Sequence, residues 1–247
     1  MIRLFSTIGN KTCTVAGDVV VGASGKLDVQ NTGSDGVLNI GGNLNVSGTL
    51  QNGSTTGTIN FTGSSCQFTA SGTVQATALS WAVNSGKSLT MNNNLTVGSS
   101  QTFTVNGTLN CGANVLSGAG AFALNSGGTL GIGSALGITS SGSTGNIQNT
   151  TRSFNTAANY TYNGSASQAV GNGLPATVNN LTIANTGSSG NNTVTLAQNT
   201  AVNGTFSTTS GTLDLNGKTL TAASAPSLGG GLQLGHLTLN YLGYLPY

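Results

Sequence analysis

The segment GTLNCGANVLSGAGAFALNSGGTLGIGSALG, residues 107–137, contains one short pattern twice. GTLNC at 107–111 returns as GTLGI at 128–132. Both copies keep a glycine, a threonine and two apolar residues separated by one position, and the residues between the copies share little. A pattern that keeps only these positions indicates a repeated structural unit.

The same unit, glycine followed by an alternating apolar pair, recurs along the chain, and a shorter form lacks the glycine. Alternation with a period of two predicts a short strand with one buried face. Threonine, valine and isoleucine suit such strands, and the Gly-, Ser- and Asn-rich segments between them suit turns. The full copies lie at 25–29, 36–40, 57–61, 107–111, 128–132 and 211–215, and shorter copies lie at 43–46, 94–97 and 180–183.

The spacing of these predicted strands determines the expected fold. A spacing of about 21 residues corresponds to one coil of two or three short strands, and repeats of that length are typical of solenoids. Stacked coils at about 4.8 Å per rung place aliphatic residues above aliphatic residues. We therefore expect an all-β, right-handed parallel β-helix (a β-solenoid) that forms one elongated domain of about a dozen coils, with no helix of ten residues.

The repeats predict three regions. Residues 11–226 carry the solenoid repeats, and residues 1–10 form an N-terminal lead-in or cap. Residues 227–247 are rich in leucine and tyrosine and form a C-terminal cap or an irregular tail. Solenoid ends need covering because an open coil exposes unpaired backbone. A disordered or foreign end and a partner-binding patch are the alternatives for this last region.

The composition argues for a folded protein with an uncharged polar surface. Of the 247 residues, 4% are charged, glutamate is absent and 39 are glycine. Such polar low-complexity chains are often disordered. However, 36% of the residues are hydrophobic and they are spread regularly, which favours a packed interior.

The charge distribution predicts neither a nucleic-acid partner nor membrane insertion. The net charge is +2 and the six basic residues do not cluster, whereas a nucleic-acid interface needs a basic stripe. No stretch approaches the ~20 apolar residues of a membrane helix. The N-terminal stretch MIRLFSTIGNKTC lacks the apolar run of a secretory signal. The chain is therefore either cytoplasmic or part of a longer protein, and the composition favours the second interpretation.

Two stretches, SFNTAANYTYNGSASQAVGNGLPATVNNLTIANTG (153–187) and TVTLAQNTAVNGTFSTTSGTLDLNGKTLT (193–221), resemble a known family. They are similar to repeats in very large secreted proteins of Bacteroidota-type bacteria, which use the type IX export route. The resemblance covers 107–221 well and 10–106 more loosely. It implies a parallel β-helix in an adhesin-like surface protein, located outside the cell as part of a longer precursor that supplies the signal and sorting domain. The matching positions are Tyr160, Tyr162, Gly173, Leu174, Pro175, Val178, Asn180, Leu181, Ile183, Val194, Leu196, Val202, Asn203, Gly204, Leu213 and Leu215.

The cysteines and the histidine predict packing roles. Cys13, Cys66 and Cys111 each alternate with an apolar neighbour, so we expect all three to point inward as small hydrophobic groups. A Cys66–Cys111 disulfide and a reactive thiol remain alternatives. His236 has no second ligand at metal-binding spacing, so it is expected to face solvent or to lie in a cap.

The four acidic residues, Asp18, Asp28, Asp35 and Asp214, offer a weak case for a site. Asp28 lies between Leu27 and Val29, so its side chain is expected to point outward, with Asp18 one coil earlier on the same face. The simplest interpretation is solubility. A weak calcium site at Asp18 and Asp28 is one alternative, since hard cations bind oxygen ligands. A carbohydrate-cleaving carboxylate pair is another.

Aromatic residues offer a second weak candidate. Trp81 shares its predicted face with Leu79 and Val83 and is expected to be buried. Arg152, Tyr160 and Tyr162 would form a weak ligand patch if the tyrosine rings were exposed to stack on sugars.

These observations predict a structural, adhesin-like rod segment of an extracellular bacterial surface protein, with no catalytic residue and no cofactor. A carbohydrate-binding module and a polysaccharide-active β-helix enzyme are the alternatives. The expected partners are glycans or another surface protein, together with end-to-end self-association.

Overall fold

The computed structural model describes residues 2–3, 11–29, 36–53 and 56–233. These residues form a β-solenoid of about 9 turns whose strands pair in parallel. Within the described residues, the one helical element is a 3₁₀ turn, Ala76–Ala78. The predicted fold class is therefore confirmed, although about a dozen coils were expected.

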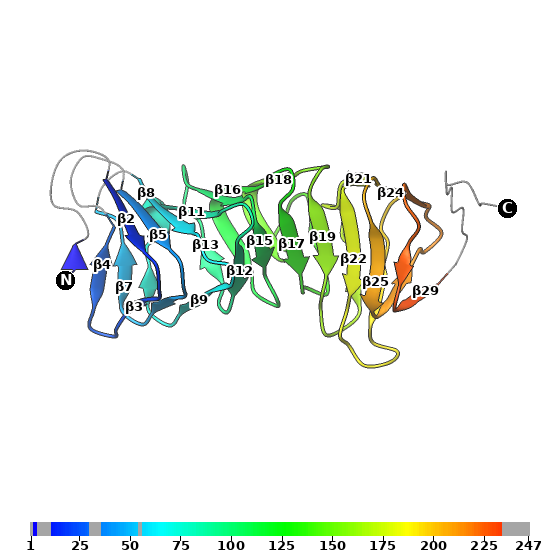
Figure 1. Ribbon diagram of the computed structural model, residues 1–247, viewed down its shortest axis with the longest axis horizontal. Helices are drawn as coiled ribbons and strands as arrows, with labels where there is room; N and C mark the ends of the chain where they lie inside the picture. Colours follow the sequence, from blue (N-terminus) through cyan, green and yellow to red (C-terminus); the bar gives the residue numbers. More distant parts are fainter. Residues whose placement is uncertain (1, 4–10, 30–35, 54–55, 234–247) are drawn as a thin grey trace. The chain divides into compact units, whose positions relative to one another are not determined.

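Strands from successive coils pair in register. β2 (Lys11–Val15) pairs along its whole length with β5 (Gly36–Ile40), and β5 pairs with β8 (Gly57–Phe61) in the same way. Figure 1 shows these strands side by side. Parallel pairing in register stacks each residue on its equivalent in the next coil. The repeat in the sequence is therefore the repeat of the coil.

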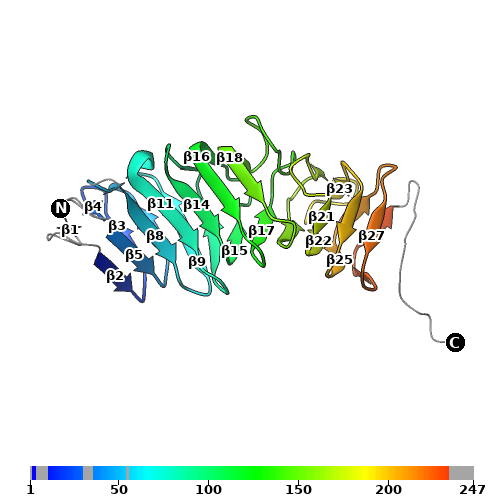
Figure 2. The ribbon, with the colours of Figure 1, turned by 90° about the horizontal axis from the view of Figure 1, so that it is seen from above.

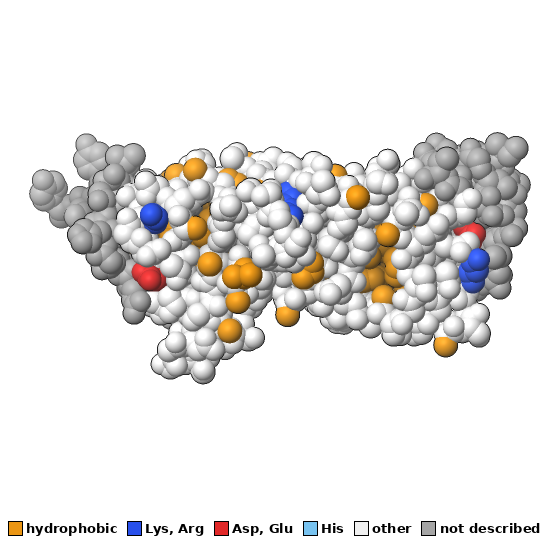
Figure 3. All heavy atoms as spheres, turned by 180° about the vertical axis from the view of Figure 1, so that it is seen from behind, with side chains coloured by type: hydrophobic (Ala, Val, Ile, Leu, Met, Phe, Trp, Pro, Cys, Tyr) orange, Lys and Arg blue, Asp and Glu red, His pale blue; other side chains and the backbone are white. Residues whose placement is uncertain are grey.

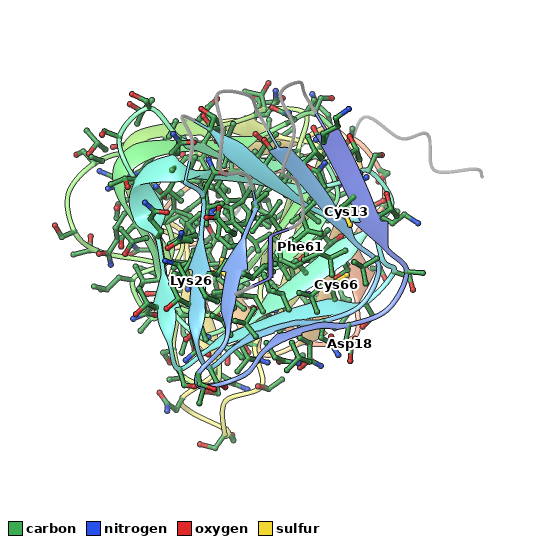
Figure 4. The ribbon with its side chains drawn as sticks, turned by 90° about the vertical axis from the view of Figure 1, so that its left-hand side faces the viewer. Cys13, Asp18, Lys26, Phe61 and Cys66 are labelled. Atoms are coloured by element: carbon green, nitrogen blue, oxygen red, sulfur yellow. The ribbon has the colours of Figure 1, made fainter. Side chains whose placement is uncertain are left out.

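The chain groups into two compact units. Unit 1 comprises Met1–Asn110, Asn114–Ala123 and Asn149–Ser153, and unit 2 comprises Cys111–Ala113, Leu124–Gln148 and Phe154–Tyr247. The strands of unit 1 belong to three sheets, and Figure 4 shows them around a filled interior. The first sheet contains β1 (Ile2–Arg3), β4 (Lys26–Asp28), β7 (Thr49–Gln51) and β10 (Thr73–Val74); the second contains β2, β5, β8, β11 (Leu79–Val83), β14 (Thr102–Val105), β16 (Leu116–Leu124), β13 (Leu95–Thr96) and β18 (Ile147–Phe154); the third contains β3 (Val19–Val21), β6 (Leu44–Val46), β9 (Cys66–Ala70), β12 (Ser88–Met91) and β15 (Thr108–Asn110).

The short strands of unit 2 also belong to three sheets, and Figure 2 shows two neighbouring strands of the first of them, β22 and β25. The first sheet contains β17 (Thr129–Ile132), β19 (Asn159–Tyr162), β22 (Asn180–Ala184), β25 (Phe206–Ser210) and β28 (Ser227–Leu228); the second contains β20 (Gln168–Ala169), β23 (Thr193–Thr195), β26 (Thr212–Asp214) and β29 (Gly231–Gln233); the third contains β21 (Thr177–Val178), β24 (Thr200–Val202) and β27 (Leu220–Ala222).

Inward side chains form continuous columns in each unit. In unit 1, Trp81 lies between Ile59 and Phe103 in register, and its ring stacks on Phe61 with centroids 6.3 Å apart. In unit 2, Tyr160 lies between Leu130 and Leu181. All these side chains are at most 1% exposed. Burial of such side chains stabilises the fold by about 1.5–3 kcal/mol each.

Outward polar side chains also bond one another from coil to coil. Asn60 donates to Asn39 Oδ1 at 2.9 Å, and Asn39 donates to Thr14 Oγ1 at 3.1 Å. In unit 2, Asn159 donates to Thr129 Oγ1 at 3.2 Å. Outward polar side chains of successive coils are therefore stacked on one another, as the inward apolar side chains are.

The coils vary in length more than the sequence predicted. Thr193 and Thr212 are register partners in neighbouring coils, and so are Thr129 and Asn159, which lie much farther apart along the chain. The turns at the corners differ in length and account for these differences. Because the coils are longer than expected, the chain forms fewer of them. Strands β1, β28 and β29 pair with the sheets outside the predicted limits of 11–226.

Glycine at position 107 allows two coils to approach closely. A Cβ atom there would overlap the carbonyl oxygens of Asn84 and Lys87. Both contacts are with backbone, which cannot rotate away. The leading glycine of this repeat unit is therefore a packing requirement.

Leu130 and Thr129 test the inward and outward assignments. Leu130 is fully buried, so Leu130→Asp places an unpaired charge in the interior and is expected to cost at least about 3 kcal/mol of unfolding free energy. Thr129→Lys changes an outward residue and is expected to cost less than about 1 kcal/mol. Denaturant unfolding monitored by circular dichroism measures both. Equal losses in the two variants would contradict the assignment.

Gly107 and Gly17 test the close approach of coils. Gly107→Ala is expected to destabilise unit 1 by about 1–3 kcal/mol because the methyl group meets backbone oxygens. A Cβ atom at Gly17 would have nothing within 4 Å, so this glycine serves as the matched control. Gly17→Ala is expected to change stability by less than about 0.5 kcal/mol. Denaturant unfolding compares the two variants, and a stable Gly107→Ala protein would show that the corner relaxes.

Candidate functional site

The first described coil of unit 1 contains a hollow of about 300 Å³, here called the end hollow. Aliphatic side chains make most of its lining, and Asp18 and Lys26 contribute its charges. Figure 4, which faces this end, labels these two residues on separate sides of the coil. The full lining is Val15, Asp18, Val19, Val20, Val21, Gly22, Gly25, Lys26, Leu27 and Leu38.

At the end hollow two of the three sheets of unit 1 reach their last described strand, whereas β1 still pairs with β4. Among the described strands, β2 and β3 each have a neighbour on one side. Val15 is half-buried, whereas its register partner Ile40 in the next coil is fully buried. This arrangement supplies an apolar hollow with one acidic and one basic group in its lining.

Asp28 does not point into solvent as predicted. It is 1% exposed, and its two carboxylate oxygens accept hydrogen bonds at 2.9 Å from Gln51 Nε2 and from the Gly53 N–H. The next coil supplies both donors, so an outward position in β4 is covered. The expectation of an exposed Asp28 was wrong because alternation along a strand does not show what covers its outer face.

The structure does not assemble the predicted cation site. Asp18 is exposed, as expected, and accepts a hydrogen bond from the Asn43 N–H at 2.7 Å, whereas Asp28 is buried beside Gln51. No group of three or more His, Cys, Asp or Glu side chains lies together in the described residues. Asp35 lies outside the described residues. Asp214, in unit 2, accepts a hydrogen bond from the Asn216 N–H at 2.8 Å.

The predicted ligand patch of Arg152, Tyr160 and Tyr162 is also wrong. Both tyrosine rings are fully buried, and their hydroxyl groups donate to the backbone oxygens of Asn155 and Val170 at 2.8 Å. Burial raises the pKa of both hydroxyls well above their usual value. Rings that fill the interior of unit 2 present no face to a sugar.

Arg152 belongs to unit 1, where it is half-buried. Its Nε donates to the backbone oxygen of Asn149 at 2.6 Å. The side chain therefore supports its own strand, β18.

The cysteines occupy the predicted inward positions. Cys66 and Cys111 are at most 1% exposed, Cys13 is half-buried, and all three are free thiols. The alternative Cys66–Cys111 disulfide is not formed. Burial raises the pKa of Cys66 and raises the pKa of Cys111 to about 12.

Trp81 is buried as predicted, at 1% exposure. Its ring meets Phe68 edge-on, with centroids 5.7 Å apart. His236 lies outside the described residues.

A buried amide in unit 2, that of Gln168, was not predicted from the sequence. Gln168 is 3% exposed, and its Nε2 donates to the backbone oxygens of Ile132 and Ser134 at 2.9 and 3.0 Å. Its Oε1 accepts from the Gly164 N–H and from Asn185 Nδ2. A polar residue at an inward position was the available signal. This amide joins a corner to the neighbouring coil, which is a structural role.

A shallow groove of about 360 Å³ lies over β24 and β27 in unit 2, with a lining that carries no charge. On the face of the molecule that Figure 3 shows, charged side chains are also sparse. The groove is lined by Ala176, Asn199, Thr200, Ala201, Thr219 and Thr221.

Comparisons with protein-family models, with curated proteins and with solved structures found no match. In the described residues, no helix has both the length and the hydropathy needed to span a bilayer.

Thiol labelling tests the burial of the three cysteines. The thiolate is the reactive form, so exclusion from solvent and a raised pKa both slow Cys66 and Cys111. We expect a thiol reagent to modify Cys13 first in the native protein, and Cys66 and Cys111 only after denaturation. Mass spectrometry of the labelled peptides locates the products. Rapid native labelling of Cys111 would contradict its position in the interior.

Proposed function

We propose that this chain is an architectural segment of an extracellular, adhesin-like bacterial surface protein. The observation that carries the proposal is that side chains on both faces of the strands bond or pack against the next coil. Inward columns are aliphatic and aromatic, and outward columns include the Asn60–Asn39–Thr14 series. Polar groups used in this way build the solenoid itself.

The resemblance of residues 107–221 to repeats of large secreted Bacteroidota-type proteins supports the same proposal. In that setting the segment would be one part of a longer precursor that is exported and displayed at the cell surface. An uncharged surface of threonine, asparagine and serine suits weak contact with glycans or with another surface protein. These partners and this location are part of the proposal.

A carbohydrate-binding module is the second candidate. The groove over β24 and β27 favours it, since Asn199, Thr219 and Thr221 offer neutral hydrogen-bonding groups along an uncharged surface. Neutral sugars are recognised by such groups together with apolar contacts. A polysaccharide-active enzyme ranks third. Glycoside hydrolysis requires two carboxyl groups about 5–10 Å apart, and both oxygens of the Asp28 carboxylate are already bonded within the fold.

End-to-end self-association completes the proposed set of interactions. The edges of β2 and β3 border the end hollow, where Val19 and Leu27 contribute to its apolar lining. Edge strands next to an apolar surface favour pairing with another chain.

A glycan array combined with a reducing-end assay on soluble polysaccharides separates the three candidates. We expect the folded 247-residue protein to show neither specific binding nor new reducing ends. Specific binding without cleavage would replace the proposal with the binding module, and Thr221→Ala should then weaken it. Turnover would establish an enzyme. A lectin and a glycosidase on the same panel control for array quality.

A further inference from the structure

The turn between β26 and β27 contains an Asn-Gly pair that differs from the other Asn-Gly pairs of this chain. The sequence has six such pairs, all within the described residues, at 52–53, 106–107, 163–164, 172–173, 203–204 and 216–217. Their shared chemistry is an amide carbon followed by an unhindered backbone nitrogen. In this arrangement the nitrogen of the glycine can attack the side chain of the asparagine. What distinguishes the pairs is therefore the structure around each glycine N–H.

In five of the six pairs the glycine N–H is held by a hydrogen bond. A backbone N–H that donates to a carbonyl, carboxylate or amide oxygen is held in place and retains its proton, so its nitrogen is less available to attack the neighbouring side chain. The five bonds are Gly53 to Asp28 Oδ1 at 2.9 Å, Gly107 to Val83 O at 3.1 Å, Gly164 to Gln168 Oε1 at 2.9 Å, Gly173 to Ile138 O at 2.9 Å and Gly204 to Asn179 O at 2.7 Å.

Gly217 has no such bond to any described residue, and the space beside its Cα atom is open. Its N–H has no acceptor among the described residues. A Cβ atom at Gly217 would meet nothing within 4 Å, whereas one at Gly107 or Gly204 would overlap an oxygen of a neighbouring coil. Asn216 and Gly217 are both exposed. Water and base therefore reach this pair.

The local backbone is a tight turn at the surface of unit 2. Asn216 and Gly217 have φ angles of 47° and 70°, and the Lys218 N–H donates to Leu215 O at 2.7 Å. Two central residues with positive φ are typical of a type I′ turn. Asn216 Nδ2 donates to Leu196 O at 3.4 Å, a long contact that restrains the side chain weakly.

We infer that Asn216 is a site of spontaneous deamidation, the position where this protein acquires a new carboxylate as it ages. Hydroxide removes the proton of the Gly217 N–H, and the nitrogen forms a bond to Cγ of Asn216. The Cγ–Nδ2 bond breaks, and ammonia leaves after taking a proton from water. Water then opens the resulting succinimide at either carbonyl, which yields aspartate or isoaspartate; the net change consumes one water and releases one ammonia.

The products change this turn in two ways. Each adds a negative charge next to Asp214, whose Oδ1 already accepts the Asn216 N–H. Isoaspartate also inserts a methylene group into the backbone between β26 and β27. This modification is independent of the proposed architectural function.

Incubation of the native protein at mildly alkaline pH, followed by peptide mapping that separates aspartate from isoaspartate, tests the inference. We expect deamidation of Asn216 to be at least several-fold faster than deamidation of the asparagine in each of the other five Asn-Gly pairs. In denaturant, the deamidation rates of the six Asn-Gly pairs are expected to become similar, because in each pair the asparagine is followed by glycine. Asn216→Gly suits the positive φ and is expected to abolish the signal at this turn while leaving the other five rates unchanged.

Two results would overturn the inference. One is faster native conversion at any of the other five asparagines than at Asn216. The other is a native order of rates equal to the order in denaturant, which would show that the hydrogen bonds of the five glycines do not protect them.

Discussion

Parallel backbone pairing in register between coils is the constraint on which the rest of this structure depends. Pairing over the full length of β2, β5 and β8 places equivalent residues on top of one another. A column of like side chains follows on each face of the sheet. Inside unit 1 and unit 2 these columns are apolar and exclude water; outside, several are amide and hydroxyl columns. The repeat in the sequence is a consequence of this stacking.

Close stacking also limits what the corners and outer faces accept. Glycine at 107 allows backbone oxygens of the preceding coil to approach. Outward positions are not free, because Asp28 is buried under donors from the next coil. At an inward position, Gln168 is bonded on both sides of its amide. Polar residues with several partners thus hold the corners, where the apolar columns cannot. These bonds leave few polar groups available for ligands at those positions.

The strands could be predicted from the sequence because alternation is a local property. Units at 36–40 and 57–61 became β5 and β8 with unchanged bounds, and the inward cysteines and Trp81 followed from the same alternation. The candidate sites were predicted less successfully than the strands. Exposure of Asp28 depends on Gln51 and Gly53 in another coil, and the tyrosines were proposed as ligands although Tyr160 and Tyr162 alternate as an inward pair.

The amino-acid sequence by itself determined that this chain forms short parallel strands around an apolar interior, since period-two alternation and regular glycines leave few other ways to bury it. Tertiary structure decided which polar groups are covered, where a hollow remains and which Asn-Gly pair has an N–H without an acceptor among the described residues. Most of these features depend on contacts between residues of different coils. Such contacts follow from the length and path of each corner, and corner residues carry little of the repeat.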